Sequence, residues 1–98
     1  MVASRAMSEL TIEVETARSS MEELRAAIDA ALHEAFPGGM LKWQWQGEVI
    51  HLSGPGAKGT IVLEGGRLVG RAHLGPPASM MRPLIEQKIR GVMQKAAA

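Results

Sequence analysis

The residues that most suggest chemistry form a glycine-rich run over 54–59, GPGAKG, which matches the letters G-x-G-x-x-G. In a dinucleotide-binding site this pattern joins a strand to a helix, so that a pyrophosphate lies at the helix N-terminus. Here the following residues, 60–63, are β-branched or apolar and predict a strand. Lys58 also precedes the last glycine, which does not fit a P-loop. The run therefore predicts a turn between two strands and no phosphate site.

Three histidines raise the question of a metal site. His33 is expected at the exposed margin of a helix, whereas His51 and His73 point to the outer face of the sheet predicted below. These two lie two strands apart there, which separates their Cβ atoms by about 10 Å or more. Two ligands that each lie about 2 Å from one zinc ion do not fit that separation, and we expect no carboxylate beside them on that face. We therefore predict solvent-facing histidines and no metal.

Groups for covalent or acid–base catalysis do not come together in the sequence pattern either. The serines at positions 19, 20, 53 and 79 are not placed with a histidine and an acid. The chain has no cysteine, which excludes disulfides, thiolate chemistry and zinc–sulfur sites. We predict that the protein is not an enzyme and holds no cofactor. The helix carboxylates are interpreted as solvated groups: Glu22, Glu23, Asp29, Glu34 and Glu86.

Size and composition favour one folded domain. The chain has 98 residues, of which 46% are hydrophobic and 21% charged. We expect a flexible tail over residues 1–7, with Met7 as an alternative start, and a single domain over 8–98. The net charge of +1 gives no reason to expect a nucleic-acid partner. Residues 1–6 are too short for a signal peptide and no apolar run is long enough to span a membrane, so we expect a cytoplasmic location.

A strand and a helix are predicted before residue 40, and a second helix is predicted at the end of the chain. Residues 10–15 alternate between apolar and polar and predict a strand. Ser20 followed by Glu23 forms a capping box, and the helix that begins there ends at the Pro37-Gly38-Gly39 run. Residues 82–95 return to the helical period after the Pro76-Pro77 pair, which predicts an extended approach. The apolar side of this second helix is expected to contain Leu84, Ile85, Ile89, Val92 and Met93.

Residues 40–75 predict four strands joined by three turns. Gly47-Glu48 and Gly65-Gly66 fit two-residue hairpin turns, and a wider turn spans 53–58. These turn lengths place the apolar residues of all four strands on one face, with both tryptophans in the core, whereas a one-residue slip would invert a strand. The predicted fold is α+β, a two-layer sandwich of order β-α-β-β-β-β-α with both helices on one face of an antiparallel sheet. The predicted pairs are Trp45 with Ile50, Trp43 with Leu52, Ile50 with Ile61, and Leu63 with Leu68.

The outer sheet face is the first candidate contact surface. It is predicted to have a row of three valines beside polar and mildly cationic rows, and it is interpreted either as a solvated face or as a surface for a homodimer or another protein. It lacks the aromatic platforms that bind single-stranded nucleic acid. The methionines before the second helix, and Met40 in the loop after the first, either fill gaps or form an adaptable patch that touches an apolar partner or surface. The candidate residues are Val49, Val62, Val69, His51, Arg71, Met80 and Met81.

Several spaced motifs resemble one known family. They are W-x-W-x-G at 43–47, L-S-G at 52–54, G-x-x-G-T-I at 56–61, the strand over 68–74, and R-P-L-I-E at 82–86. This pattern, from about residue 10 to the last helix, resembles the polyhydroxyalkanoic acid system proteins, also called polyhydroxyalkanoate granule-region proteins. The family is associated with bacterial storage-polyester metabolism and has no accepted catalytic residues to carry over. The Pro76-Pro77 pair departs from its pattern.

The resemblance implies a non-enzymatic accessory protein of polyhydroxyalkanoate metabolism, which acts through contacts with granule-associated proteins or the granule surface. The alternative is a small acyl- or lipid-binding module with a cavity between helices and sheet. The large side chains of both tryptophans, Ile61 and Leu63 speak against such a cavity, so a small ligand is not expected. A third interpretation is a purely structural homodimer.

Overall fold

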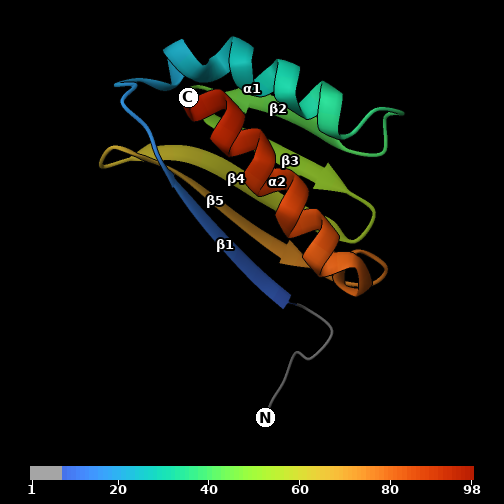
Figure 1. Cartoon of the computed structure of the whole chain (residues 1–98). Helices are drawn as coiled ribbons and strands as arrows, with labels where there is room; N and C mark the ends of the chain where they lie inside the picture. The colour runs from blue at the N-terminus through green and yellow to red at the C-terminus, as the bar shows by residue number, and fades with distance from the viewer. Residues whose placement is uncertain (1–7) are drawn as a thin grey trace.

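The computed structural model describes residues 8–98, and the predicted tail over 1–7 lies outside the described residues. Its order of elements is the predicted one, with a short 3-10 helix added before the last helix (Figure 1). The elements are β1 (Ser8–Glu15), α1 (Met21–Ala35), β2 (Lys42–Gln46), β3 (Val49–Gly54), β4 (Ala57–Glu64), β5 (Arg67–Leu74), η1 (Ala78–Met81) and α2 (Arg82–Ala97).

Helix α1 begins at the predicted cap. Ser20 has an extended backbone, with φ −147°, and its hydroxyl accepts a hydrogen bond from the Glu23 N–H at 3.4 Å. The Glu23 carboxylate accepts in turn from the Ser19 N–H at 3.1 Å, so it satisfies a free donor just before the helix. The helix ends at Phe36, before two glycines with positive φ.

The sheet has the order β1-β5-β4-β3-β2, and all neighbours are antiparallel. The four predicted residue pairs are confirmed. Gly47, Gly65 and Gly66 have positive φ, as the hairpin turns require. The sequence pattern did not place β1, which pairs with β5 and forms the edge opposite β2.

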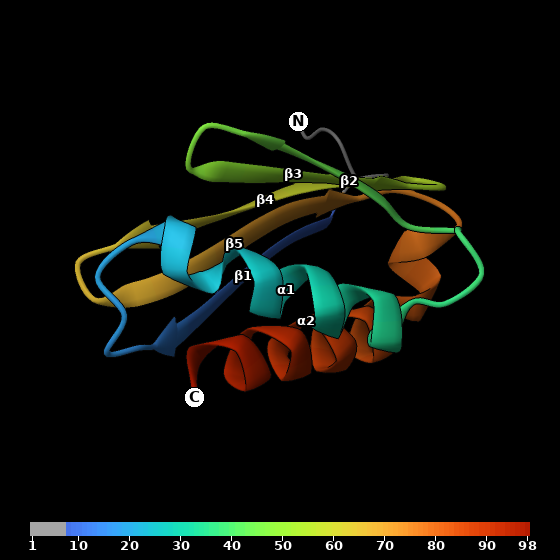
Figure 2. The same ribbon diagram turned by 90° about the horizontal axis from the view of Figure 1, so that it is seen from above.

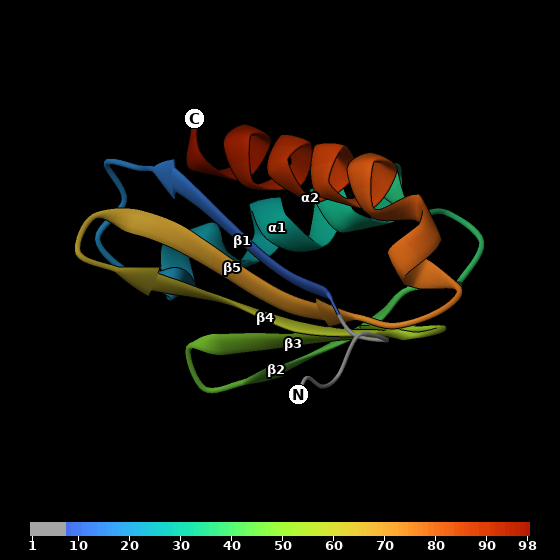
Figure 3. The ribbon, with the colours of Figure 1, turned by 90° about the horizontal axis from the view of Figure 1, so that it is seen from below.

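Both helices lie on one face of the sheet, so the α+β two-layer prediction is confirmed (Figures 2 and 3). Apolar side chains from the sheet and both helices meet between the layers, and Ile28, Ile50, Ile61 and Met93 are fully buried there. No helix among residues 8–98 is long and apolar enough to cross a membrane.

Three details differ from the prediction. Leu84 is 44% exposed, because only the second half of α2 packs deeply and Val92 and Met93 are its buried residues. Both tryptophans are half-buried, since β2 is an edge strand. The approach to α2 is the short helix η1 in place of an extended segment.

Candidate contact surfaces

The outer sheet face has the predicted rows but less accessible apolar surface than expected. Val69 is only 4% exposed, and Val49 and Val62 are half-buried. On β1, the residue opposite Val69 is Glu13, whose carboxylate lies 3.0 Å from the Arg67 guanidinium. Val69 therefore offers little surface to a partner.

Two polar residues of this face, Arg71 and His73, lie beside carboxylates. His51 and Arg71 are exposed, and the Arg71 guanidinium lies 3.5 Å from the Glu64 carboxylate. His73 Nδ1 lies 3.5 Å from the Glu9 carboxylate, so the expectation of no carboxylate beside these histidines is wrong. The reason is that β1, which the turns did not place, brings its glutamates to this face. No group of three potential metal ligands occurs within residues 8–98.

A second surface lies at one end of the sheet and contains all the large apolar side chains that are exposed within residues 8–98. We call it the methionine end, and its members are Met40 (71% exposed), Met80 (81%), Met81 (50%) and Leu84 (44%). Of these, the sequence analysis singled out Met80 and Met81 as candidate contact residues. Met40 and Leu84 extend the patch.

Three loops hold the methionine end together. The α1–β2 loop packs on the β3–β4 turn, because a Cβ at Gly54 would lie 3.4 Å from the Met40 carbonyl oxygen. The same turn contacts the segment before η1, since the Gly75 N–H donates to the Gly56 carbonyl at 2.6 Å. Figure 2 shows the α1–β2 loop and η1 at the same end of the molecule. The β3–β4 turn therefore contacts both the loop that contains Met40 and the segment that leads into η1.

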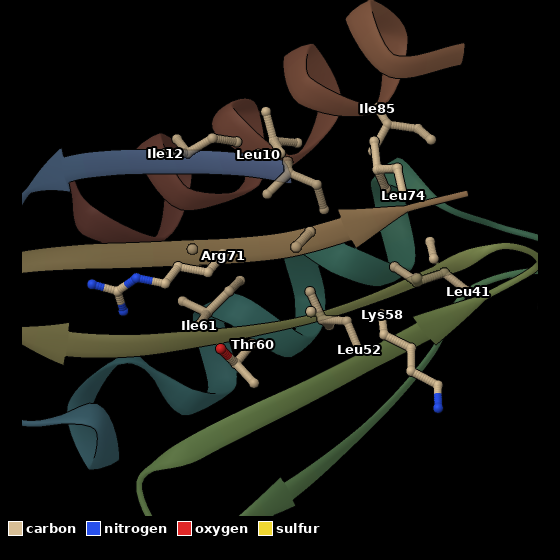
Figure 4. A pocket seen from close by; sticks show the side chains of 15 residues that line it. Leu10, Ile12, Leu41, Leu52, Lys58, Thr60, Ile61, Arg71, Leu74 and Ile85 are labelled. Atoms are coloured by element: carbon tan, nitrogen blue, oxygen red, sulfur yellow. The ribbon is translucent and has the colours of Figure 1, made fainter. Parts of the chain in front are cut away.

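An apolar cavity of about 50 Å³ lies between the sheet and α2 beside this end (Figure 4). One row of paired residues crosses the inner face of the sheet from β3 to β1. Its two middle residues, Gly59 and Ala72, are small, whereas its end residues, Leu52 and Leu10, are large. The small residues leave the space that forms the cavity. The remaining large residues around it include Leu41, Leu74, Ile85 and Ile89. Leu41 and Ile85 directly adjoin Met40 and Leu84 in sequence, so the cavity borders the methionine end.

A third arrangement, missed by the sequence analysis, fixes α1 to the edge strand β2. One carboxylate oxygen of Asp29 accepts a hydrogen bond from each indole N–H, at 3.1 Å from Trp43 and 2.9 Å from Trp45. His33 meets Trp43 edge-on at 4.9 Å between ring centroids, and the Arg25 guanidinium lies 4.9 Å from the Trp45 ring centre. We call these five residues the tryptophan clamp.

The clamp corrects two interpretations. Asp29 is not a solvated carboxylate, because it is half-buried and holds both indoles. His33 is exposed as expected, but its ring packs on Trp43 and Nδ1 lies 3.0 Å from the Asp29 carbonyl oxygen. The signal was present in the sequence, since positions 25, 29 and 33 are spaced by four on one helix face, opposite W-x-W on a strand.

Comparison with known proteins supplies the context for these surfaces. A family described as "putative polyhydroxyalkanoic acid system protein" matches the chain over residues 9–96. The chain belongs to this family. The match covers every strand and helix described above, apart from the outermost residue of β1 and of α2. A search of curated proteins gave no match to this chain.

Membership links the protein to the polyhydroxyalkanoate system and confirms the family indicated by the sequence motifs. The motifs that carried the resemblance have structural roles here. The two tryptophans of W-x-W-x-G form the clamp, and G-x-x-G-T-I contains the turn glycine and the small floor of the cavity.

Proposed function

We propose that this protein is a non-catalytic accessory component of the polyhydroxyalkanoate system, which works in the cytoplasm through contacts of its surface with granule-associated proteins or the granule surface. The observation that carries the proposal is the methionine end, where four apolar side chains from three segments are exposed at the same end of the molecule. Exposed apolar patches on small domains mark interaction sites. Family membership supplies the system in which the contact takes place.

The alternative of an acyl-binding module receives little support from the cavity. Its volume of about 50 Å³ holds only a few water molecules, whereas pockets for small ligands measure about 300–1,000 Å³. Enlarging it requires α2 to move away from the sheet, although Val92 and Met93 anchor this helix in the core. Native mass spectrometry of protein purified from its host tests this, and we expect the mass of the unliganded chain.

A fluorescent fusion expressed in a polymer-accumulating bacterium tests the main proposal. We expect the wild-type fusion to colocalise with granules or to change their number and size. Replacement of Met80 and Met81 with serine should reduce both effects, because the contact loses its most exposed side chains. A diffuse signal that leaves the granules unaltered would contradict the proposal.

A further inference from the structure

The chemistry of the methionine end narrows the kind of surface that it contacts. Three of its four apolar side chains are methionines, which are unbranched and flexible and adapt to an irregular or fluid apolar phase. Met80 and Met81 lie on the one-turn helix η1, and Met40 on a loop, so all three project from short connections at the edge of the domain. This arrangement suits shallow insertion into an interface better than the deep groove that a partner helix would require.

Four basic residues at this end of the molecule form no ion pair with a carboxylate within residues 8–98. Lys42 and Lys58 flank Ser53 in the last outer-face row before the β3–β4 turn, and neither forms an ion pair within residues 8–98. Nearby, the Arg82 guanidinium donates to the Glu9 carbonyl at 2.9 Å, and Lys88 donates to the Ala35 carbonyl at 2.8 Å. Both of these side chains bind neutral carbonyl groups and therefore keep their positive charge uncompensated.

Each of three acidic side chains near this end has a basic neighbour. Glu9 faces His73 at 3.5 Å, Glu86 pairs with Arg90 at 3.2 Å, and Glu34 pairs with Lys95. The His73 contact contributes charge only when the imidazole is protonated, and with a neutral imidazole Glu9 is an exposed negative charge in the same row as Lys58. The surface is thus an apolar tip with a cationic border, although the whole chain has a net charge of only +1.

We infer that the methionine end binds lipid interfaces that carry anionic head groups. The methionines enter the apolar layer, while Lys42 and Lys58 remain at head-group level, where long side chains keep their charge in water. Each basic residue near an anionic surface strengthens such binding. This inference deepens the surface-contact proposal and rests on it for the natural setting, but the binding itself follows from the side chains.

Vesicle co-sedimentation of the full chain tests the inference, with phosphatidylcholine vesicles containing one part in three of phosphatidylglycerol compared with pure phosphatidylcholine. We expect preferential binding to the anionic vesicles. The Met80→Ser/Met81→Ser variant should bind about tenfold or more weakly, because two apolar side chains no longer enter the layer. Met40→Ser, in a different loop, provides an independent second variant that disturbs neither η1 nor α2.

Charge reversal supplies a matched pair. Lys58→Glu and Arg18→Glu change the net charge equally, but Arg18 is exposed near the start of α1, at the opposite end of the sheet. We expect Lys58→Glu to weaken binding to anionic vesicles about fivefold or more, and Arg18→Glu to change it by less than about twofold. Equal losses in both variants would reduce the effect to bulk charge and overturn the inference.

Other outcomes are equally decisive. Absence of wild-type binding to anionic vesicles would overturn the inference, and so would binding that the methionine variants leave unaltered. Self-association that the same variants abolish would assign the end to a second copy of the chain. Vesicle binding combined with a diffuse fusion in cells would refute the granule proposal alone. A fusion that colocalises with granules, combined with no vesicle binding, would overturn the lipid inference and leave contact with a granule-associated protein as the explanation.

Discussion

Large apolar side chains are covered by other residues in the tryptophan clamp and are exposed to solvent at the methionine end. In the clamp, two indoles on an edge strand are held by one carboxylate and covered by an arginine and a histidine. At the methionine end, comparably large side chains have no such cover, and Met80 is 81% exposed. Both regions flank the same interlayer core. The fold thus covers the large side chains of its edge strand and leaves flexible apolar groups uncovered at the end that we propose as the contact surface.

The largest expected effect comes from the turn that supports the methionine end. In Gly56→Ala, the new Cβ would lie 2.6 Å from the carbonyl oxygens of Gly75 and Pro76, at a residue with φ +75°. We expect the free energy of unfolding to fall by about 3 kcal/mol, from backbone strain plus overpacking. Urea denaturation measures this.

Gly66→Ala is the matched control for that variant. Gly66 has φ +79°, but a Cβ there meets nothing within 4 Å, so this change adds strain without a clash. We expect a loss of about 1–2 kcal/mol. Equal losses at both positions would show that the packing of the turn against Gly75 and Pro76 contributes nothing.

The second effect breaks the clamp. Asp29→Ala leaves two half-buried indole N–H groups without their acceptor, and we expect unfolding to require about 2–3 kcal/mol less free energy. Asp29→Asn retains an acceptor oxygen and should lose about half as much. Since Trp43 and Trp45 are the two tryptophans of the chain, the native fluorescence emission of the alanine variant should shift to the red. A wild-type midpoint for Asp29→Ala would contradict a structural role for the clamp.

A smaller effect concerns the cover of the clamp. Arg25→Ala removes the cation 4.9 Å from the Trp45 ring centre and should cost about 0.5–1 kcal/mol. Arg25→Lys keeps a cation on a flexible stem, and we expect it to recover part of this loss. Thermal unfolding of the three proteins ranks them. An alanine variant as stable as wild type would mean that the stacking is only a surface contact.

No effect is expected on the outer sheet face. Because Val69 is buried and Val49 and Val62 are half-buried, we expect wild type and Val62→Lys to elute identically in size exclusion, as 10.5 kDa monomers. Elution of wild type as a dimer, and of Val62→Lys as a monomer, would show that this face is a contact surface. The outer sheet face would then replace the methionine end as the first candidate for function.

Sequence reasoning succeeded where structure is set by neighbours along the chain. The turns at Gly47 and Gly65-Gly66 fix hairpin register, so the pairs across β2 to β5 follow from counting residues. It did not place a strand that a helix separates along the chain from the rest of the sheet. The position of β1 beside β5, and with it the Glu9–His73 contact, depends on how a whole helix crosses the sheet.

The exposure and contacts of the candidate surface residues also depend on how separate elements pack, which the sequence does not show. Met80 and Met81 were recognisable as apolar residues outside a periodic element, but the exposure of Leu84 depends on how far α2 stands from the sheet. Asp29 looked like any other helix carboxylate, because its two partners lie 14 and 16 residues further along the chain. Only the mutual placement of α1 and the edge strand distinguishes it.

The pairing of the first strand with the last has a consequence for the order in which the chain folds. During synthesis, β1 leaves the ribosome with Leu10 and Ile12 uncovered, and its only strand partner is not complete until residue 74. The meander can assemble from short-range hairpins, whereas β1 must close a loop of more than fifty residues. We therefore expect docking of β1 to be a late step of folding, and we expect the glutamates at 9, 13 and 15 to disfavour aggregation of the unpaired strand.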